Sequence, residues 1–148
     1  MIYDPSQDEM FIAQKSKGAF LNNKKIEINK SKNDNCIMYE FSSKIINVKR
    51  ASELLGELSK LRYVKKSFGS VGIHYCYVAC GRASAAVTIN KDTFPEFAGK
   101  LILEEAGGIV TDFKGREINF DTRGVVFSDG IIHKDILKII HKTKIEVL

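Results

Sequence analysis

The chain has 148 residues, 44% of them apolar and 28% charged, and carries a formal net charge of +5. This length suits one domain, and the composition excludes a disordered, collagen-like or low-complexity protein. No apolar run approaches the roughly 20 residues that span a bilayer, and residues 1–10 lack the basic start of a signal peptide. We therefore expect a globular protein without a membrane segment.

The sequence contains three cysteines, Cys36, Cys76 and Cys80. An odd number of cysteines without a leader indicates reduced thiols and a cytoplasmic location. Cys76 and Cys80 are spaced as neighbours on a helix face, but further ligands at zinc spacing are missing. We predict that these side chains pack in the interior as small apolar groups.

The positive charge is concentrated in the first half of the chain. Residues 1–74 carry 13 basic and 8 acidic side chains, whereas residues 75–148 carry 10 of each. Such an excess suits nucleic acid or an anionic ligand. We favour a solvated lysine-rich surface, because no arginine-rich or aromatic-interleaved motif accompanies the lysines.

Residues 1–28 are predicted to be β-structure. A turn at residues 4–8 precedes short apolar runs, and an asparagine turn at 22–23 precedes an alternating segment. The expected strands are 10–13, 18–21 and 25–28. The polar segment 29–35 is predicted to be a loop and the boundary between two units.

After this loop, predicted strands and helices alternate. The expected strands are 36–39, 64–68, 85–89, 109–111 and 125–127, and the expected helices are 51–61, 70–80, 95–105 and 132–140. Ser70 is placed to cap the second of these helices and Gly81 to end it. This alternation favours a layered α/β domain.

Three motifs in this order resemble the inositol monophosphatase family. The family runs YDP, DELF and GxGAFLNG are matched by YDP at 3–5, DEMF at 8–11 and KGAFLN at 17–22. Its GSAAxxLxxVAxG helix is matched at 69–81, and its WDxAAGxxxxxEAGG segment is matched by Ala98-Gly99 and by EEAGG at 104–108. The resemblance extends from residue 2 to about residue 140, and the joint spacing makes it specific.

The resemblance implies an α/β sandwich of the inositol-monophosphatase type, with a mixed sheet and helices. Residues 1–30 would be a β-hairpin remnant of the N-terminal domain, and residues 31–148 the C-terminal α/β domain. The family's members are Mg²⁺-dependent phosphomonoesterases that hydrolyse small phosphates and are commonly homodimers. Bound Mg²⁺ activates water and neutralises charge on the phosphate.

The Glu-Glu pair and the DPxDGT motif that hold most of the metal in this family are absent from the 148 residues. The chain therefore resembles the C-terminal half of such a phosphatase, as a natural truncation, one half of a split enzyme or an excised piece. We expect little or no activity from it alone. An exposed hairpin would require a homo-oligomer or a partner chain that carries the N-terminal half.

Alignment on Ala98-Gly99 places Glu96 at the family's metal-binding Asp, which makes it the candidate metal ligand. Its extra methylene group carries the carboxylate further out than an aspartate would. A second interpretation is structural, because Thr93, Pro95 and Glu96 fit a capping box at the start of a helix. Both interpretations stay open at this point.

Gly69, Ser70 and Val71 match the family's substrate-binding helix start, where N–H groups and a hydroxyl suit a polar or anionic ligand. The alternative for Ser70 is that it only caps its own helix. The family's substrate-facing acid would lie near Ile89, yet neither Ile89 nor Thr88 is acidic. This puts an inositol-type substrate in question.

Other polar residues carry weaker signals. We interpret His74 as structural and Asp92 as a loop acid, and we find no acid or nucleophile at a suggestive spacing from His133 or His141. The rival hypotheses are a non-catalytic module that binds a protein or nucleic acid, and a relic whose fold alone is kept.

Overall fold

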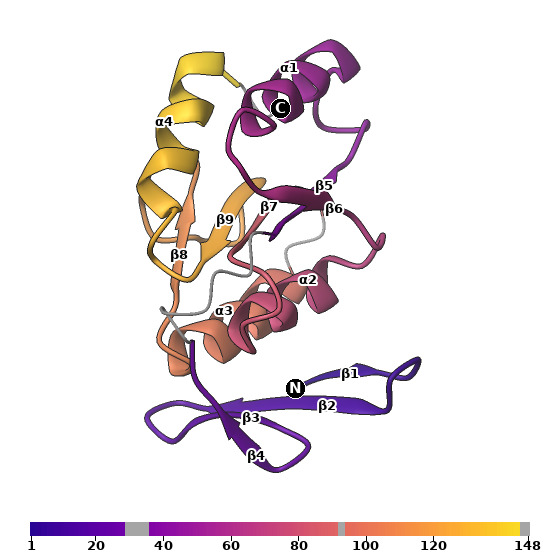
Figure 1. The fold of residues 1–148 in the computed structure, drawn as a ribbon, viewed down its shortest axis with the longest axis vertical. Helices are drawn as coiled ribbons and strands as arrows, with labels where there is room; N and C mark the ends of the chain where they lie inside the picture. The colour runs from indigo at the N-terminus through magenta and orange to yellow at the C-terminus, as the bar shows by residue number, and fades with distance from the viewer. Residues whose placement is uncertain (29–35, 92–93, 146–148) are drawn as a thin grey trace.

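The computed structural model describes residues 1–28, 36–91 and 94–145. Within them, helices and sheets alternate in four layers (Figure 1). A pair of helices covers the outer face of a five-stranded sheet, a second pair covers its other face, and a four-stranded sheet lies beneath the second pair. The helices are α1 (Val48–Leu58), α2 (Val71–Ala79), α3 (Phe94–Glu105) and α4 (His133–Thr143).

The five-stranded sheet is mixed, with the strand order β6-β5-β7-β9-β8. Strand β5 is parallel to β6 and β7, whereas β9 is antiparallel to β7 and β8. The strands are β5 (Cys36–Phe41), β6 (Val64–Lys66), β7 (Ala85–Ile89), β8 (Ile109–Asp112) and β9 (Gly124–Ser128). The predicted α/β sandwich with a mixed sheet is confirmed.

The central strand β7 is buried along its whole length. Because side chains alternate between the two faces of a strand, Val87 and Ile89 pack towards α1 and α4, while Ala86 packs towards α2 and α3. Thr88 shares the face of Ala86 and is also fully buried. A polar side chain thus lies under the α2/α3 pair, where it needs a hydrogen-bond partner.

The first 28 residues form an antiparallel meander in the order β1-β2-β3-β4. The strands are β1 (Ile2–Asp4), β2 (Glu9–Gln14), β3 (Gly18–Leu21) and β4 (Lys24–Ile26). The meander has one strand more than expected from the sequence. Strand β1 has only three residues, too few to show alternation, and it forms by pairing with β2, with Tyr3 opposite Met10.

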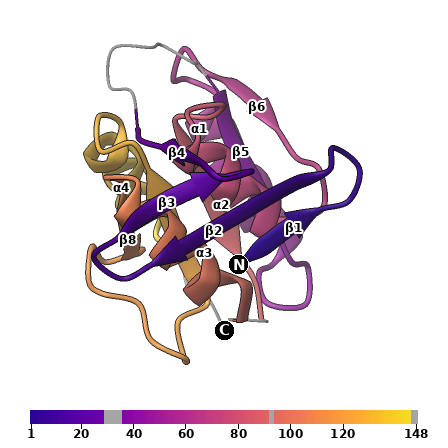
Figure 2. The same ribbon diagram turned by 90° about the horizontal axis from the view of Figure 1, so that it is seen from below.

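The meander is fastened to the helices by charged side chains and by the core. Glu105 at the end of α3 accepts backbone hydrogen bonds from Ser16 at 2.7 Å and Gly18 at 2.8 Å. Arg82 forms two hydrogen bonds of 2.6 Å with the Glu9 carboxylate. Figure 2 shows the strands crossing directly beneath α2 and α3. The division of the chain at residue 30 stays a prediction.

Most helix boundaries differ from the expected ones by one to three residues, and the largest shift is in α1. This helix begins three residues earlier than predicted because the Asn47 side chain accepts the Lys49 N–H at 2.8 Å and caps it. The predicted loop at 29–35 and the predicted cap residue Thr93 lie outside the described residues. No helix in the described part of the chain is long and apolar enough to cross a membrane.

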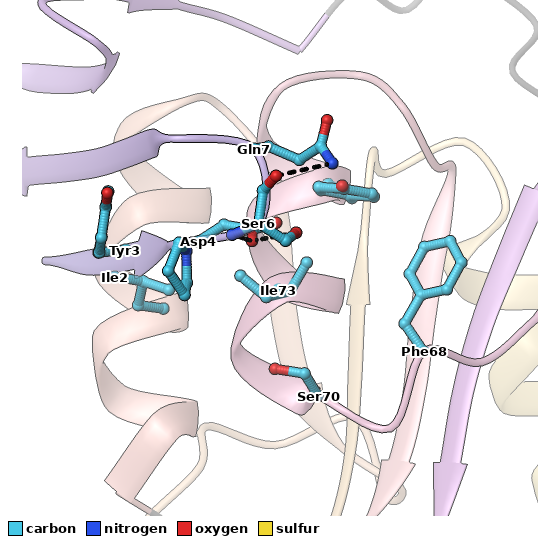
Figure 3. A pocket seen from close by; sticks show the side chains of 10 residues that line it. Ile2, Tyr3, Asp4, Ser6, Gln7, Phe68, Ser70 and Ile73 are labelled. Atoms are coloured by element: carbon cyan, nitrogen blue, oxygen red, sulfur yellow. Dashed lines mark hydrogen bonds between the residues drawn. The ribbon is translucent and has the colours of Figure 1, made fainter.

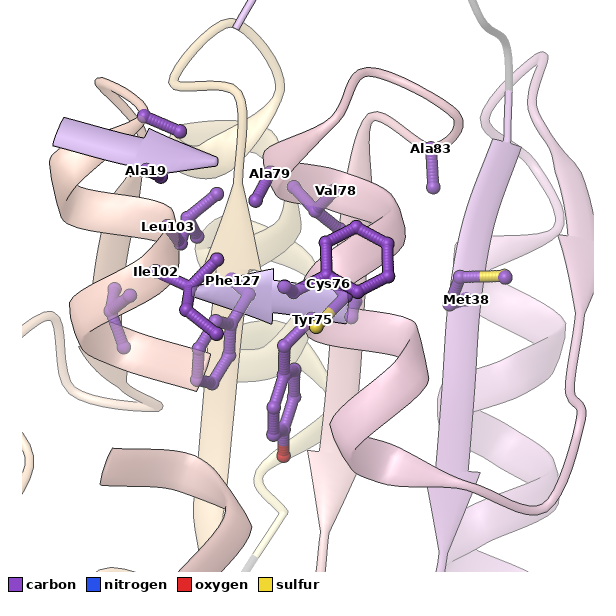
Figure 4. Close-up of a cluster of buried hydrophobic side chains, with 14 of the residues drawn as sticks. Ala19, Met38, Tyr75, Cys76, Val78, Ala79, Ala83, Ile102, Leu103 and Phe127 are labelled. Atoms are coloured by element: carbon purple, nitrogen blue, oxygen red, sulfur yellow. The ribbon is translucent and has the colours of Figure 1, made fainter. Parts of the chain in front are cut away.

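Helices α2 and α3 approach each other closely at Gly99. A Cβ built on Gly99 would lie 2.4 Å from Cδ2 and 2.8 Å from Cβ of Tyr75. The absence of a side chain at this position therefore lets the two helices meet around the Tyr75 ring. The same ring stacks on Phe127 of β9, with centroids 3.7 Å apart (Figure 4).

We predict that Gly99→Ala destabilises the protein by about 1–3 kcal/mol, because the added methyl group overlaps the immobile Tyr75 ring. Gly56→Ala is the matched control. Gly56 also lies inside a helix, but a Cβ there would meet no atom within 4 Å, so this change should stabilise by roughly 0.5–1 kcal/mol. Urea unfolding measures both, and equal effects of the two substitutions would contradict this account of the helix contact.

Candidate functional site

The start of α2 presents an uncapped backbone to the surface. Ser70 occupies the N-cap position with an extended backbone (φ −136°, ψ 99°), but its side chain makes no capping hydrogen bond. Gly69 precedes it with φ +69°, a left-handed conformation that favours glycine. The structure thus places Ser70 where the sequence predicted a cap, yet its hydroxyl is not used to cap the helix.

An open pocket of about 420 Å³ lies at this helix start. The predicted substrate-binding residues Gly69, Ser70 and Val71 line one side, and Phe94 and Pro95 at the start of α3 line the other. The starts of α2 and α3 therefore face one pocket. Backbone N–H groups at such positions have no partner within the helix and suit an anion or a polar ligand.

A second pocket of about 600 Å³ adjoins Ser70 on the other side (Figure 3). Its walls come from the turn after β1 and from Phe68 and Ile73. Asp4, in this turn, accepts hydrogen bonds from the backbone and hydroxyl of Ser6 at 2.9 and 2.7 Å. The Ser6 hydroxyl lowers the pKa of the Asp4 carboxyl, so the acid is ionised and engaged in the turn.

Glu96, the candidate metal ligand, points into the protein. Only 3% of its surface is exposed. Its Oε1 accepts a hydrogen bond of 3.2 Å from the Tyr75 hydroxyl, which also lies 2.8 Å from Thr88 Oγ1. Burial raises the pKa of the Tyr75 hydroxyl, and the Glu96 carboxylate adds to the rise, so Tyr75 keeps its proton and donates it.

The arrangement around Glu96 does not fit a magnesium ion. Mg²⁺ requires oxygen ligands in an octahedron, usually carboxylates and water. Across the residues that the structure describes, no group of three or more His, Cys, Asp or Glu side chains gathers to hold a metal. One interior carboxylate bonded to a tyrosine supplies a single ligand, and Thr88 is neutral where the family resemblance would place an acid nearby.

The structure contains a serine–histidine pair that sequence reasoning missed. His133 Nδ1 lies 2.7 Å from Ser128 Oγ, and Nε2 lies 2.9 Å from Thr111 Oγ1. Because Thr111 donates its own proton to the Asp112 carbonyl, Nε2–H is the donor to Thr111, and Ser128 donates to Nδ1. All of Ser128 and 95% of His133 are buried, so the pair fixes the start of α4 rather than meeting a ligand.

His74 is structural, as the sequence predicted. It is fully buried, and its Nε2 accepts the Phe68 N–H at 3.0 Å. The ring proton therefore lies on Nδ1, which has no hydrogen-bond partner within the described residues. His141 contacts the Phe113 carbonyl through Nε2 at 2.8 Å, whereas Asp92 lies outside the described residues.

The three cysteines lie inside the described part of the chain, and none forms a disulfide there. Cys36 and Cys76 are buried, and Cys80 is half-buried. Burial raises the pKa of the Cys76 and Cys80 thiols, which keeps both protonated and poorly nucleophilic. The predicted role of the cysteines as packed interior groups fits these surroundings.

Comparison with known proteins places this chain in a family. The sequence model of the inositol monophosphatase family matches residues 1–144, so the chain belongs to that family. It is 28% identical over 153 aligned positions to a fructose-1,6-bisphosphatase/inositol-1-monophosphatase of Thermotoga maritima, which covers 99% of this chain and 56% of the relative. It is also 35% identical over 124 positions to the Nus factor SuhB of Xylella fastidiosa, over 79% of this chain and 44% of that protein.

The solved structures agree with this assignment. An IMPase of Thermotoga maritima superposes with a TM-score of 0.83 at 28% identity, over 96% of this chain and 55% of that structure. The chain thus spans about half the length of the relatives it matches. Members of the family are generally metal-dependent, and the relatives named here include phosphatases and a Nus factor.

The buried histidines predict a loss of stability in mild acid. Burial lowers the pKa of His74 and His133 below the ordinary value of 6.5. As the pH falls below about 6.5, these histidines become protonated in the unfolded chain but stay neutral in the folded chain. The free energy of unfolding is therefore highest above this pH and decreases as the pH drops towards the folded-state pKa. The expected slope is at most about 1.4 kcal/mol per pH unit for each histidine.

Urea unfolding between pH 7.5 and 5 measures this slope, and NMR titration of the ring protons measures the folded-state pKa directly. Replacing His74 and His133 by Gln should flatten the profile. Folded-state titration of either ring at or above pH 6.5 would contradict the assignment.

Proposed function

We propose that this chain forms the substrate-binding part of a phosphomonoesterase site of the inositol-phosphatase type. The observation that carries the proposal is the pocket where the starts of α2 and α3 face each other, lined by Gly69, Ser70 and Val71. The ligand class is a small phosphate monoester. Family membership over residues 1–144 supports this assignment.

The chemistry available at this pocket is binding and charge stabilisation. The N–H groups at the start of α2 and the helix dipole attract a phosphate oxygen. The Ser70 hydroxyl makes no capping hydrogen bond and adds a further donor. These groups hold an ester in place but supply neither a nucleophile nor a general acid. We therefore propose that the isolated 148 residues bind a phosphate ester without hydrolysing it.

Hydrolysis would need carboxylates beyond those that the described residues bring together. We propose that Mg²⁺ binds only in an assembled site to which a second chain, or sequence outside these 148 residues, contributes most ligands. Of the two interpretations of Glu96, we propose the structural one. Reduced thiols support a cytoplasmic location for such an assembly.

The outer face of the four-stranded sheet supports a partner or a second copy. Tyr3, Met10, Ile12 and Phe20 point away from the helices, and Tyr3 and Ile12 are 46% and 39% exposed. Figure 2 views this face, which no described helix or strand covers. An apolar sheet face of this kind is usually covered in a stable assembly, and sedimentation of a lone monomer at all concentrations would argue against one.

A second candidate function is a non-catalytic binding module. Two observations favour it: the described residues lack a metal-ligand cluster, and one relative, at 35% identity, is a Nus factor. The partner would be a protein or a nucleic acid. RNA binding that weakens steeply with salt would favour this function over the phosphatase-type one.

The substrate pocket can be tested with a backbone substitution, Val71→Pro. Val71 is the first helical residue, where proline fits the helix but removes one N–H donor, and the extended Ser70 tolerates a following proline. We expect about tenfold weaker binding of inorganic phosphate, the group shared by small phosphate monoesters, through the loss of one charge-assisted hydrogen bond. NMR titration of the backbone amides measures the affinity.

Val48→Pro is the matched control, since Val48 is the first residue of α1, follows the extended cap Asn47 and lies far along the chain from the pocket. It should bind like the wild type. Equal binding by Val71→Pro and the wild type, or no amide shifts near Ser70 in either, would contradict the assigned pocket.

A further inference from the structure

The interior between α2, α3 and the five-stranded sheet contains three polar side chains in one chain of hydrogen bonds. Tyr75 comes from α2, Thr88 from β7 and Glu96 from α3. Tyr75 and Thr88 are fully buried, and Glu96 is 3% exposed. We propose that Tyr75 is a positioning residue that holds the Glu96 carboxylate inside the protein, so that Glu96 fixes the start of α3 and does not bind a divalent cation.

The hydrogen-bond directions are mutually consistent. The Tyr75 hydroxyl has one proton, which it donates to Glu96 Oε1 at 3.2 Å. Its oxygen can then accept the Thr88 proton at 2.8 Å. Thr88 donates to Tyr75 and Tyr75 donates to Glu96, and each of the three residues belongs to a different element. The three side chains thus join α2, α3 and the central strand through groups that would be costly to leave unpaired.

The Tyr75 ring cannot leave this position without repacking the core. One face lies on Phe127, with an interplanar angle of 12°. At Gly99, the space that a Cβ atom would need is taken up by Cδ2, Cβ and Cγ of Tyr75. Figure 4 shows Tyr75 between α2 and Phe127, with its hydroxyl pointing away from Cys76. The hydroxyl position is therefore set by packing, and the carboxylate position follows from it.

A cation at Glu96 would have to compete with this arrangement. The carboxylate has almost no surface towards solvent, and Mg²⁺ keeps several waters that need room around it. Turning Glu96 outward would break its bond with Tyr75 and leave a hydroxyl in the interior. The cation ligands of an assembled site would then come from residues other than Glu96. This inference concerns the chain's own interior and stands even if the pocket at Ser70 binds no phosphate ester.

Mn²⁺ broadening of amide NMR signals in the full chain tests the cation half of the proposal. We expect Mn²⁺ to cause no selective broadening of the Phe97 and Gly99 amide signals in the wild type. The same absence of broadening is expected for Glu96→Gln. Selective broadening of these signals in the wild type, lost in Glu96→Gln, would overturn the proposal. The wild-type spectrum alone is decisive if the variant fails to fold.

A double-mutant cycle tests the positioning half. Tyr75→Phe and Glu96→Leu should each raise the unfolding equilibrium constant roughly tenfold, because each removes the buried hydrogen bond between the two side chains. In the double variant the unfolding equilibrium constant should rise by much less than the product of the two single-variant factors, because both polar groups are removed together. Tyr75→Phe combined with Glu53→Leu, on the separate helix α1, is the control pair and should give the simple product. A simple product for the Tyr75 and Glu96 pair would overturn the proposal.

Discussion

The contact between α2 and α3 at Gly99 is the constraint on which the candidate site depends. Because Gly99 has no side chain, the Tyr75 ring fits between the two helices and the sheet. This contact brings the two helix starts to one pocket and sets the Tyr75 hydroxyl between Thr88 and Glu96. The pocket at the helix starts and the buried polar network are thus two consequences of one packing arrangement.

Under the proposed function, the same contact separates binding from catalysis. The N–H groups of α2 face the pocket, whereas the carboxylate at the start of α3 turns inward and is used in packing. The chain belongs to a family whose members are generally metal-dependent, but its described residues bring together no metal-ligand cluster. We therefore propose a binding role for this chain and cation binding by residues other than Glu96.

The order of elements and the family could be predicted from the sequence because both depend on local signals. Apolar periodicity marks α1 and α4. The Ser70 and Gly81 signals bound α2, and motifs such as EEAGG are contiguous. The orientation of Glu96 could not be predicted, since the capping and metal roles share one sequence pattern and differ only in tertiary contacts. Tyr75 gave no signal, because an aromatic residue on an apolar helix is ordinarily core. The bond between Ser128 and His133 was missed because a strand end and a helix start bring them together.

The most direct test of the account is Mg²⁺-dependent phosphate release by the purified chain from a panel of small phosphomonoesters, with Glu96→Gln beside the wild type. The account predicts no release by either protein, while the wild type still binds the ester at the start of α2. Mg²⁺-dependent release by the wild type that Glu96→Gln abolishes would contradict it, because Glu96 would then be a metal ligand in a working site.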